Sequence, residues 1–265
     1  MLQVLLISIG NELLKGKTIN TNATFLGEKL TNMGFKVLKI ITIPDEGTIV
    51  SSEISQALAT SDFRLIIITG GLGPTWDDST SLFLANALNI GTELNPEALN
   101  IVKRRYNELF EANLVDSPEI NPSRRKMAIM PIGAKPFDNP IGTAPGICFD
   151  HKLSNTLIYC LPGVPREMKE MFYIIEPKLI ALINKDDVGY YELAITTSFT
   201  DESLLAPYIE KVQQKFDVWI KSLPETYQEK KNIKLLITKS SDSQNNAKRT
   251  VLTAKDYFEE LIKSS

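Results

Sequence analysis

The chain has 265 residues, of which 43% are hydrophobic and 23% are charged, and its formal net charge is −3. This length fits one medium domain and one small domain, and the charge excludes a global positive field for nucleic acid or an anionic membrane. The one histidine, His151, excludes histidine-rich zinc sites, while two cysteines in apolar stretches are typical of buried thiols in a cytoplasmic protein.

The first 90 residues alternate between apolar strands and amphipathic helices. Strands are predicted at residues 2–9, 35–43 and 64–69, and helices at residues 20–33, 47–60 and 79–89. The apolar run that opens the chain is too short to span a bilayer and lacks a basic leader, so it indicates a buried strand. In the second helix, Ile49, Ile54 and Leu58 are expected to face inward. The alternating order predicts a three-layer αβα domain with a mostly parallel sheet.

The rest of the chain is predicted to complete this domain and to add a second one. Helices are expected at 95–112 and 165–182, and between them a hairpin with strands at 146–150 and 156–161. The βαββα pattern that follows predicts a small α+β domain, in which Thr200 caps the first helix. We therefore divide the chain into residues 1–183 and residues 184–265.

The loops after the first three strands belong together, because ligands of open parallel sheets bind beyond the carboxyl ends of the strands. The first loop begins with Gly10, Asn11 and Glu12, and the second places Asp45 directly after a proline. The third is "GGLGPTWDDST", residues 70–80. Its glycines permit a positive φ, and its backbone N–H groups, with those that begin the next helix, can converge on an anion.

Two aspartates at this anion cradle create a chemical problem. Asp45 and Asp78 would repel a phosphate unless a cation lies between them, and Mg²⁺ or a similar hard ion, bound by carboxylates and ligand phosphates, resolves this. The residues therefore predict a metal-assisted phosphate or pyrophosphate site. Simpler interpretations exist, because tight turns need glycine and Asp45, Asp77 or Asp78 can be a helix N-cap. Trp76 can stack on a ring or cover the sheet end. The basic segments "KRRY" at 103–106 and "SRRK" at 123–126 can reach a phosphate, although solvated helix faces are favoured.

In combination these residues resemble a known family. The third loop is similar to the hallmark loop of the MoaB/Mog-like molybdopterin-binding domains, and most of all to its version in the N-terminal half of the competence/damage-inducible CinA proteins. Five further motifs agree in order: "SIGNELLKG" (8–16), "NTNATFL" (20–26), "IPDE" (43–46), "NPIGTAPG" (139–146) and "LPGVPREMKEMF" (161–172). The resemblance covers roughly residues 1–180, and CinA-like proteins also carry a small α+β domain next.

The resemblance implies roles for particular residues. In Mog-like relatives, the aspartates that match Asp78 and Asp45 are required for activity, so these two are the expected catalytic residues and metal ligands. Asp77, beside them, is expected to cap the helix. With the loop argument, the expected ligand-binding residues are Gly10, Asn11, Glu12, Asn22, Gly70, Gly71, Leu72, Gly73, Pro74, Thr75, Asp77, Gly142, Thr143, Ala144, Pro145, Gly146, Pro162, Gly163, Val164 and Pro165.

CinA-type domains look like metal-dependent pyrophosphatases of ADP-ribose and similar dinucleotides, and the related domain of FAD synthetases cleaves FAD. The resemblance thus implies cleavage of a P–O–P bridge to release AMP, with Mg²⁺, Co²⁺ or Ni²⁺ as cofactor. The alternatives are a molybdopterin-binding or adenylyl-transfer protein of molybdenum cofactor synthesis, and a ligand sensor without catalysis. The added α+β domain favours the pyrophosphatase, as does Leu72, because Mog-like adenylyltransferases are usually single domains with "GGTG" in this loop.

The sequence also departs from the family's pattern. Asn20 stands where the family often has aspartate, and Lys126-Met127-Ala128 stands where it usually has a Gln-Ala segment. Bacterial CinA proteins carry a further C-terminal domain that deamidates nicotinamide mononucleotide, and a chain that ends at Ser265 is expected to lack it. We expect a small-molecule nucleotide or pterin ligand, a homo-oligomer with a dimer favoured, and no nucleic-acid or membrane partner.

Overall fold

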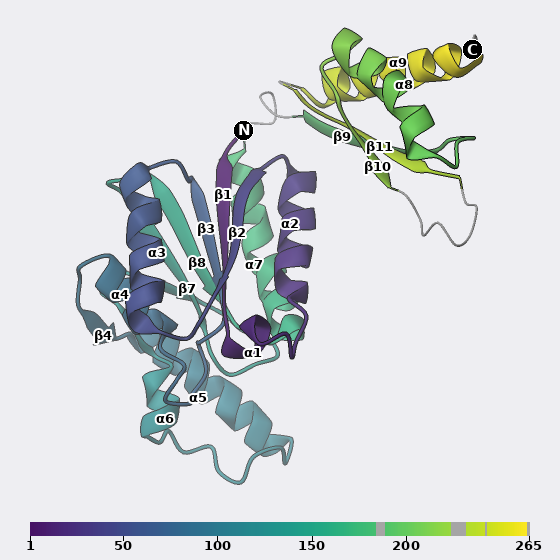
Figure 1. Ribbon diagram of the computed structural model, residues 1–265. Coiled ribbons are helices and arrows are strands. Elements are labelled where there is room, and N and C mark those ends of the chain that lie inside the picture. The colour runs from purple at the N-terminus through teal and green to yellow at the C-terminus, as the bar shows by residue number, and fades with distance from the viewer. Residues whose placement is uncertain (184–188, 224–231, 242, 264–265) are drawn as a thin grey trace. The chain divides into compact units, whose positions relative to one another are not determined.

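The structure, a computed structural model, describes residues 1–183, 189–223, 232–241 and 243–263 (Figure 1). The chain divides into two compact units. The larger comprises Leu2–Thr31 and Phe35–Ala181, and the smaller is built mainly from Leu182–Ser265. The predicted boundary between residues 183 and 184 adjoins the segment 184–188, which lies outside the described residues.

The larger unit is built on a six-stranded sheet. Its strands are β1 (Gln3–Ile9), β2 (Lys36–Ile43), β3 (Leu65–Thr69), β6 (Lys135–Phe137), β7 (Gly146–His151) and β8 (Thr156–Leu161). They lie in the order β2-β1-β3-β8-β7-β6. The first four strands of that order are parallel, whereas β7 and β6 run antiparallel to their neighbours. The mostly parallel sheet that the sequence predicted is therefore confirmed.

Helices cover both faces of this sheet. They are α1 (Asn11–Leu14), α2 (Thr21–Met33), α3 (Gly47–Thr60), α4 (Thr80–Ala87), α5 (Pro96–Glu111), α6 (Pro122–Lys126) and α7 (Pro165–Leu182). The helices α2 and α7 lie together on one face, where the rings of Phe25 and Phe172 meet edge to face at 5.5 Å, and α3 and α4 lie on the other (Figure 1). A short pair of strands, β4 (Thr92–Leu94) and β5 (Ile129–Pro131), adds a small antiparallel sheet beside α4.

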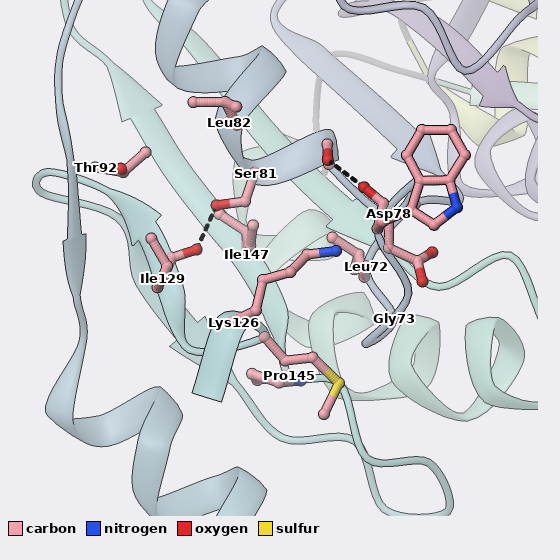
Figure 2. Close-up of a pocket in the computed structure, with 14 residues that line it drawn as sticks. Leu72, Gly73, Asp78, Ser81, Leu82, Thr92, Lys126, Ile129, Pro145 and Ile147 are labelled. Atoms are coloured by element: carbon pink, nitrogen blue, oxygen red, sulfur yellow. Dashed lines mark hydrogen bonds between the residues drawn. The ribbon is translucent and has the colours of Figure 1, made fainter. Parts of the chain in front are cut away.

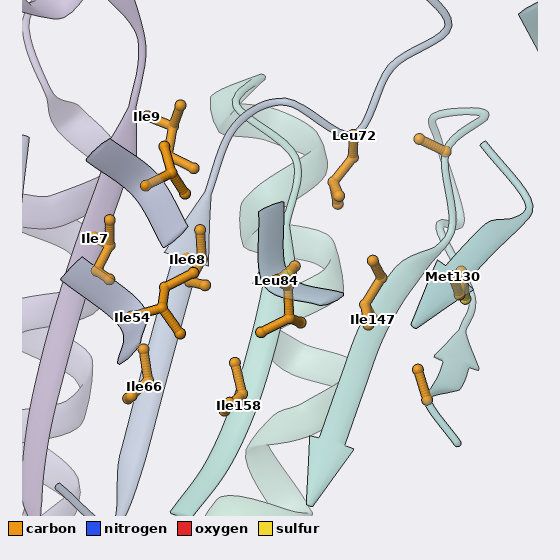
Figure 3. Close-up of a cluster of buried hydrophobic side chains, with 14 of the residues drawn as sticks. Ile7, Ile9, Ile54, Ile66, Ile68, Leu72, Leu84, Met130, Ile147 and Ile158 are labelled. Atoms are coloured by element: carbon orange, nitrogen blue, oxygen red, sulfur yellow. The ribbon is translucent and has the colours of Figure 1, made fainter. Parts of the chain in front are cut away.

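The main core lies between the sheet and the α3–α4 layer (Figure 3). Alternate residues of the central strands face this layer, and all five residues of β3 are buried, as a strand covered on both faces requires. Ile54 of α3 and Leu84 of α4 pack onto them, and both side chains are fully buried. Leu72 extends the same cluster beyond the end of β3, so the core reaches into the loop that follows the strand.

Two local predictions for the larger unit are wrong. Ile49 is 37% exposed, and Val50 is the buried residue instead. The buried positions of α3 are Val50, Ile54, Ala57 and Leu58, a spacing of four, seven and eight residues that leaves Ile49 off the inner face. The segment after β1, predicted as a loop, forms the short helix α1.

The smaller unit has the predicted βαββα order. Its strands are β9 (Gly189–Thr196), β10 (Trp219–Leu223) and β11 (Lys234–Ser241), in the antiparallel order β10-β11-β9, and its helices are α8 (Glu202–Lys215) and α9 (Gln244–Lys263). The cap of α8 is Asp201 rather than Thr200, because the Asp201 carboxylate accepts the N–H of Ser203 at 2.8 Å. No described helix of either unit is long and apolar enough to cross a membrane.

Replacing Leu84 by alanine tests the packing of α4 on the sheet. Because the side chain is fully buried, we expect Leu84→Ala to lower the free energy of unfolding by about 2–5 kcal/mol. The control is Leu82→Ala on the same helix, which removes the same atoms from a side chain that is 49% exposed and should cost less than about 1 kcal/mol. Urea denaturation followed by circular dichroism measures both, and equal losses would contradict this packing.

Candidate functional site

The predicted site residues gather at the edge of the sheet where the parallel strands end. Each of β1, β2, β3 and β8 is followed there by a segment that carries some of them. Backbone hydrogen bonds join these segments: the N–H of Gly10 donates to the Ile43 carbonyl at 3.1 Å, and that of Gly70 donates to the Leu161 carbonyl at 3.0 Å. The loop after β3, residues 70–79, is called the glycine loop below.

Two glycines allow this loop to leave the sheet. Gly70 and Gly71 have φ angles of +106° and +67°, in the region that L side chains rarely adopt. A Cβ on Gly70 would collide with the carbonyl oxygen of Ile9, and one on Gly71 with the hydroxyl of Thr80. That hydroxyl donates to the Gly70 carbonyl at 2.8 Å, and the Thr80 N–H donates to the Gly71 carbonyl at 3.0 Å. The buried Thr80 therefore fastens the loop to the start of α4.

Hydrogen bonds around Thr75 close the far end of the loop. One carboxylate oxygen of Asp78 accepts the Thr75 N–H at 2.9 Å and the Thr75 hydroxyl at 2.6 Å. The same hydroxyl also lies in hydrogen-bond contact with the Asp77 carboxylate, and since it has one proton, the two carboxylates compete for it. The hydrogen bond from this hydroxyl is the main cause that lowers the pKa of Asp77 below its usual value. The predicted role of Asp77 as a helix cap is wrong, because Ser79 occupies the N-cap of α4.

A lysine reaches the same loop from a distant part of the chain. The Lys126 ammonium, at the end of α6, donates to the carbonyl of Thr75. Partial burial lowers the pKa of Lys126, while the negative charges of Asp78 and Asp77 oppose that shift. The solvated helix face predicted for "SRRK" is therefore wrong for this lysine. The departure from the family's Gln-Ala segment at this point was the one signal in the sequence that could have marked it.

A pocket of about 260 Å³ opens beside the glycine loop (Figure 2). Apolar side chains dominate its wall, and Lys126 and Asp78 provide its charges. Trp76 is 90% exposed at this pocket, so it does not cover the sheet end, and its ring is free to stack on a planar ligand. The lining residues are Gly71, Leu72, Gly73, Trp76, Asp78, Ser79, Ser81, Leu82, Thr92, Lys126, Met127, Ile129, Pro145 and Ile147.

Only part of the predicted ligand-binding set lines this pocket. The shared residues are Gly71, Leu72, Gly73, Asp78 and Pro145. A second, smaller hollow is lined by another part of the set, namely Glu12, Asn22, Gly163 and Pro165. The rest line neither: Gly10, Asn11, Asp45, Gly70, Pro74, Thr75, Asp77, Gly142, Thr143, Ala144, Gly146, Pro162 and Val164. The set thus divides between two concave regions, and Gly70, Thr75 and Asp77 shape the loop between them.

The predicted metal ligands do not share a contact. The Asp45 carboxylate accepts the N–H of Asn11 at 2.9 Å, which fixes the start of α1, whereas Asp78 binds Thr75. Among the described residues, no three His, Cys, Asp or Glu side chains gather into a group that could hold a metal ion. The oxygen donors of Asp78 and Asp77 fit a hard cation that takes its remaining ligands from water and a phosphate. The roles of Asp78 and Asp45 in catalysis and metal binding stay predictions.

Buried polar residues that the sequence did not reveal shape the loop that carries Pro145. Asn139 is fully buried; its side-chain Oδ1 accepts the N–H of Gly142 at 2.7 Å, and its side-chain Nδ2 donates to the carboxylate of Glu167 at 2.8 Å. Arg105 donates to the Gly142 carbonyl at 2.7 Å. These partners come from α5 and α7, so no local pattern could have identified them.

Comparison with known proteins agrees with this fold. Residues 5–181 match the family model described as "Probable molybdopterin binding domain". A protein of Saccharolobus solfataricus is 40% identical over 223 residues, which are 84% of this chain and 78% of that protein. A protein of Pyrococcus abyssi is 40% identical over 222 residues, which are 84% of this chain and 85% of its own. The crystal structure of "the protein CinA with unknown function" from Thermoplasma acidophilum aligns with a TM-score of 0.60 and 33% identity, and the alignment covers 67% of this chain and 97% of that one.

The hydrogen bonds around Thr75 predict how a substitution shifts the titration of Asp77. In Thr75→Val the hydroxyl that stabilises the ionised carboxylate is absent, so the pKa of Asp77 should rise toward its usual value. NMR titration of the carboxylate carbons measures this shift. Thr92→Val, which makes the same change at a threonine that lines the pocket, should leave the pKa of Asp77 unchanged, and the same result for Thr75→Val would contradict the arrangement.

Proposed function

This chain belongs to the family of probable molybdopterin binding domains, and we propose that it is a metal-dependent pyrophosphatase of ADP-ribose, FAD or a similar dinucleotide. The reaction would cleave the P–O–P bridge and release AMP. The observation that carries the proposal is the joint placement of Asp78, Lys126 and Trp76 around one pocket. The Lys126 ammonium can pair with a phosphate chain, and the Asp78 carboxylate can hold a cation that bridges to it. The exposed indole of Trp76, beside apolar walls, suits a planar ring.

The residues of the chain would divide the work of binding. Backbone N–H groups of the glycine loop and of the first turn of α4 would bind a phosphate group, and the helix dipole adds to their effect. The Lys126 ammonium, now held by the Thr75 carbonyl, would offset phosphate charge. Apolar groups, among them Leu72 and Met127, would exclude water and strengthen these electrostatic interactions.

A divalent cation is part of this proposal. Asp78, with Asp77 beside it and Asp45 from the neighbouring loop, would hold the ion, which supplies Lewis-acid polarisation of a phosphoryl oxygen when bound. The carboxylate of Asp78 would also keep the glycine loop closed through Thr75. The Asp45 carboxylate also accepts the N–H of Asn11 at 2.9 Å, so it would hold the loop after β1 in place beside the ion.

A second candidate function is molybdopterin binding or adenylyl transfer in molybdenum cofactor synthesis. It is favoured by the description of the matching family and by the apolar wall of the pocket, which a pterin ring would fill as well as a nucleotide base would. Both candidates require a small phosphorylated ligand with a planar ring. The predicted dimer and the predicted cytoplasmic location stay predictions under either candidate.

Replacing Asp78 tests the proposed reaction. The full chain is incubated with ADP-ribose or FAD and with Mg²⁺, Co²⁺ or Ni²⁺, and release of AMP is followed by chromatography. We expect AMP from the wild type, and a rate at least about 100-fold lower from Asp78→Asn, which removes the negative charge and keeps the size. Asp62→Asn, on an exposed residue, is the matched control. No AMP with any metal, together with tight pterin binding, would contradict the proposal and favour the second candidate.

The role of Lys126 predicts how binding responds to pH. Its lowered pKa means that the ammonium loses its proton at a lower pH than an ordinary lysine, so affinity for pyrophosphate should fall early as the pH rises. Arginine stays charged in this range, so Lys126→Arg should keep its affinity at alkaline pH, while Lys126→Met should bind about 10-fold more weakly at neutral pH. Calorimetric titration measures each affinity, and the exposed Lys103→Met serves as control. A wild-type profile identical to that of Lys126→Met would rule this role out.

A further inference from the structure

The second hollow lies at the N-terminal end of α2 and has its own lining. Its volume is about 60 Å³, which exceeds the ~15 Å³ that one water needs. It shares no lining residue with the pocket beside the glycine loop. Six of its eleven lining residues are polar, namely Glu12, Thr18, Asn20, Thr21, Asn22 and Thr69.

One buried group in this wall lacks a partner. Asn22 is only 7% exposed, and its amide nitrogen donates to the carbonyl of Gly163 at 2.8 Å. Its Oδ1 is buried and has no hydrogen-bond partner in the described part of the chain. The orientation of the amide follows from chemistry, because the opposite one would place Oδ1 against another acceptor, the Gly163 oxygen. Buried acceptors are rarely left unpaired, so a ligand that donates a hydrogen bond is expected here.

A second acceptor in the same wall is the carboxylate of Glu12. It forms no hydrogen bond or ion pair with the other described residues. Its oxygens lie 2.5 and 2.8 Å from the point where a Cβ on Gly10 would be, so the side chain folds back over the end of β1. An amide oxygen and a carboxylate both accept hydrogen bonds, and the negative charge repels a phosphate. The chemistry of the hollow therefore favours a group that donates hydrogen bonds and carries no negative charge.

The hollow is connected to the pocket through the start of the glycine loop. Gly163, which lines the hollow and holds Asn22, approaches Gly70 so closely that a Cβ on it would lie 3.4 Å from the Gly70 Cα. The next residue, Gly71, lines the pocket. The hollow and the pocket therefore border the same short segment of backbone.

We propose that the hollow is the subsite for the hydrogen-bond donor edge of a nucleoside, with Asn22 and Glu12 as the acceptors. The inference rests on the proposed function, which makes a nucleotide the ligand. Two groups of a nucleoside share this chemistry, the vicinal hydroxyls of the ribose and the exocyclic amino group of the base. The pair of acceptors matches the pair of ribose hydroxyls, so these are the expected occupants.

Nucleosides test the hollow without the phosphate site, because they carry no phosphate. Equilibrium dialysis of the full chain compares adenosine with 2′,3′-dideoxyadenosine, which lacks both vicinal hydroxyls of the ribose, and with inosine, which lacks the amino group. We expect adenosine to bind about 10-fold more tightly than dideoxyadenosine. If inosine binds more weakly than adenosine while dideoxyadenosine binds equally well, the amino group is the donor, and this result would still support the subsite.

Variants connect this preference to the two acceptors. Glu12→Gln and Asn22→Leu should reduce the preference for adenosine over dideoxyadenosine to less than about 3-fold. Glu28→Gln makes the first change at an exposed position of α2 and should keep the full preference. Asn22→Leu also removes the buried hydrogen bond to Gly163. Glu12 is exposed, so Glu12→Gln tests the subsite without changing that contact.

The outcomes separate this inference from the proposed reaction. Equal affinities for the three nucleosides, or no binding of any of them, would overturn the subsite and leave the hollow to a structural water. Release of AMP from ADP-ribose would then still support the pyrophosphatase. Conversely, a preference for adenosine that Glu12→Gln abolishes, without cleavage of any dinucleotide, would retain the subsite and reject the reaction.

Discussion

The hydrogen bonds from Thr75 to the carboxylate of Asp78 close the glycine loop, and the rest of the site depends on that closure. The closure needs Gly73, because a Cβ at this position would lie 2.6 Å from the accepting oxygen of Asp78. Once the loop is closed, Leu72 reaches the core and Trp76 projects into solvent. The same turn presents the Thr75 carbonyl to Lys126. A loop of ten residues thus connects the hydrophobic core to the charged end of the pocket.

The charges around this loop do not balance. Asp77 and Asp78 are negative, and Lys126 is the cation that contacts the loop, so the group keeps a net negative charge at neutral pH. A phosphate chain needs further positive potential, which backbone N–H groups, the start of α4 and a divalent ion can supply. The sequence argument required a cation beside the aspartates. The structure provides one of the chain's own, and this reduces the charge that a metal ion must neutralise.

Much of the fold followed from local patterns in the sequence. The continuous apolar run of β3 predicted a strand buried on both faces, and the alternation of strands and helices predicted the parallel sheet. The wrong predictions chose the neighbour of the correct residue. They gave Ile49 instead of Val50 as a buried residue of α3, and Thr200 instead of Asp201 as the cap of α8. Such choices depend on the rotation of a helix against its neighbour, which a pattern fixes only to within a residue.

The sequence by itself determined which segments form the site: the glycine loop with Asp78, the loop that carries Asp45, and the two glycine- and proline-rich turns. Those features are local, because positive φ angles, short turns and helix starts depend on residues that are adjacent in the chain. Only the tertiary structure decided that Lys126 contacts the Thr75 carbonyl of the glycine loop, that Asp45 accepts the N–H of Asn11, and that Asn22 lines a separate hollow. These contacts join residues far apart in the chain, at distances set by how helices and strands pack around the sheet, and no spacing in the sequence records them.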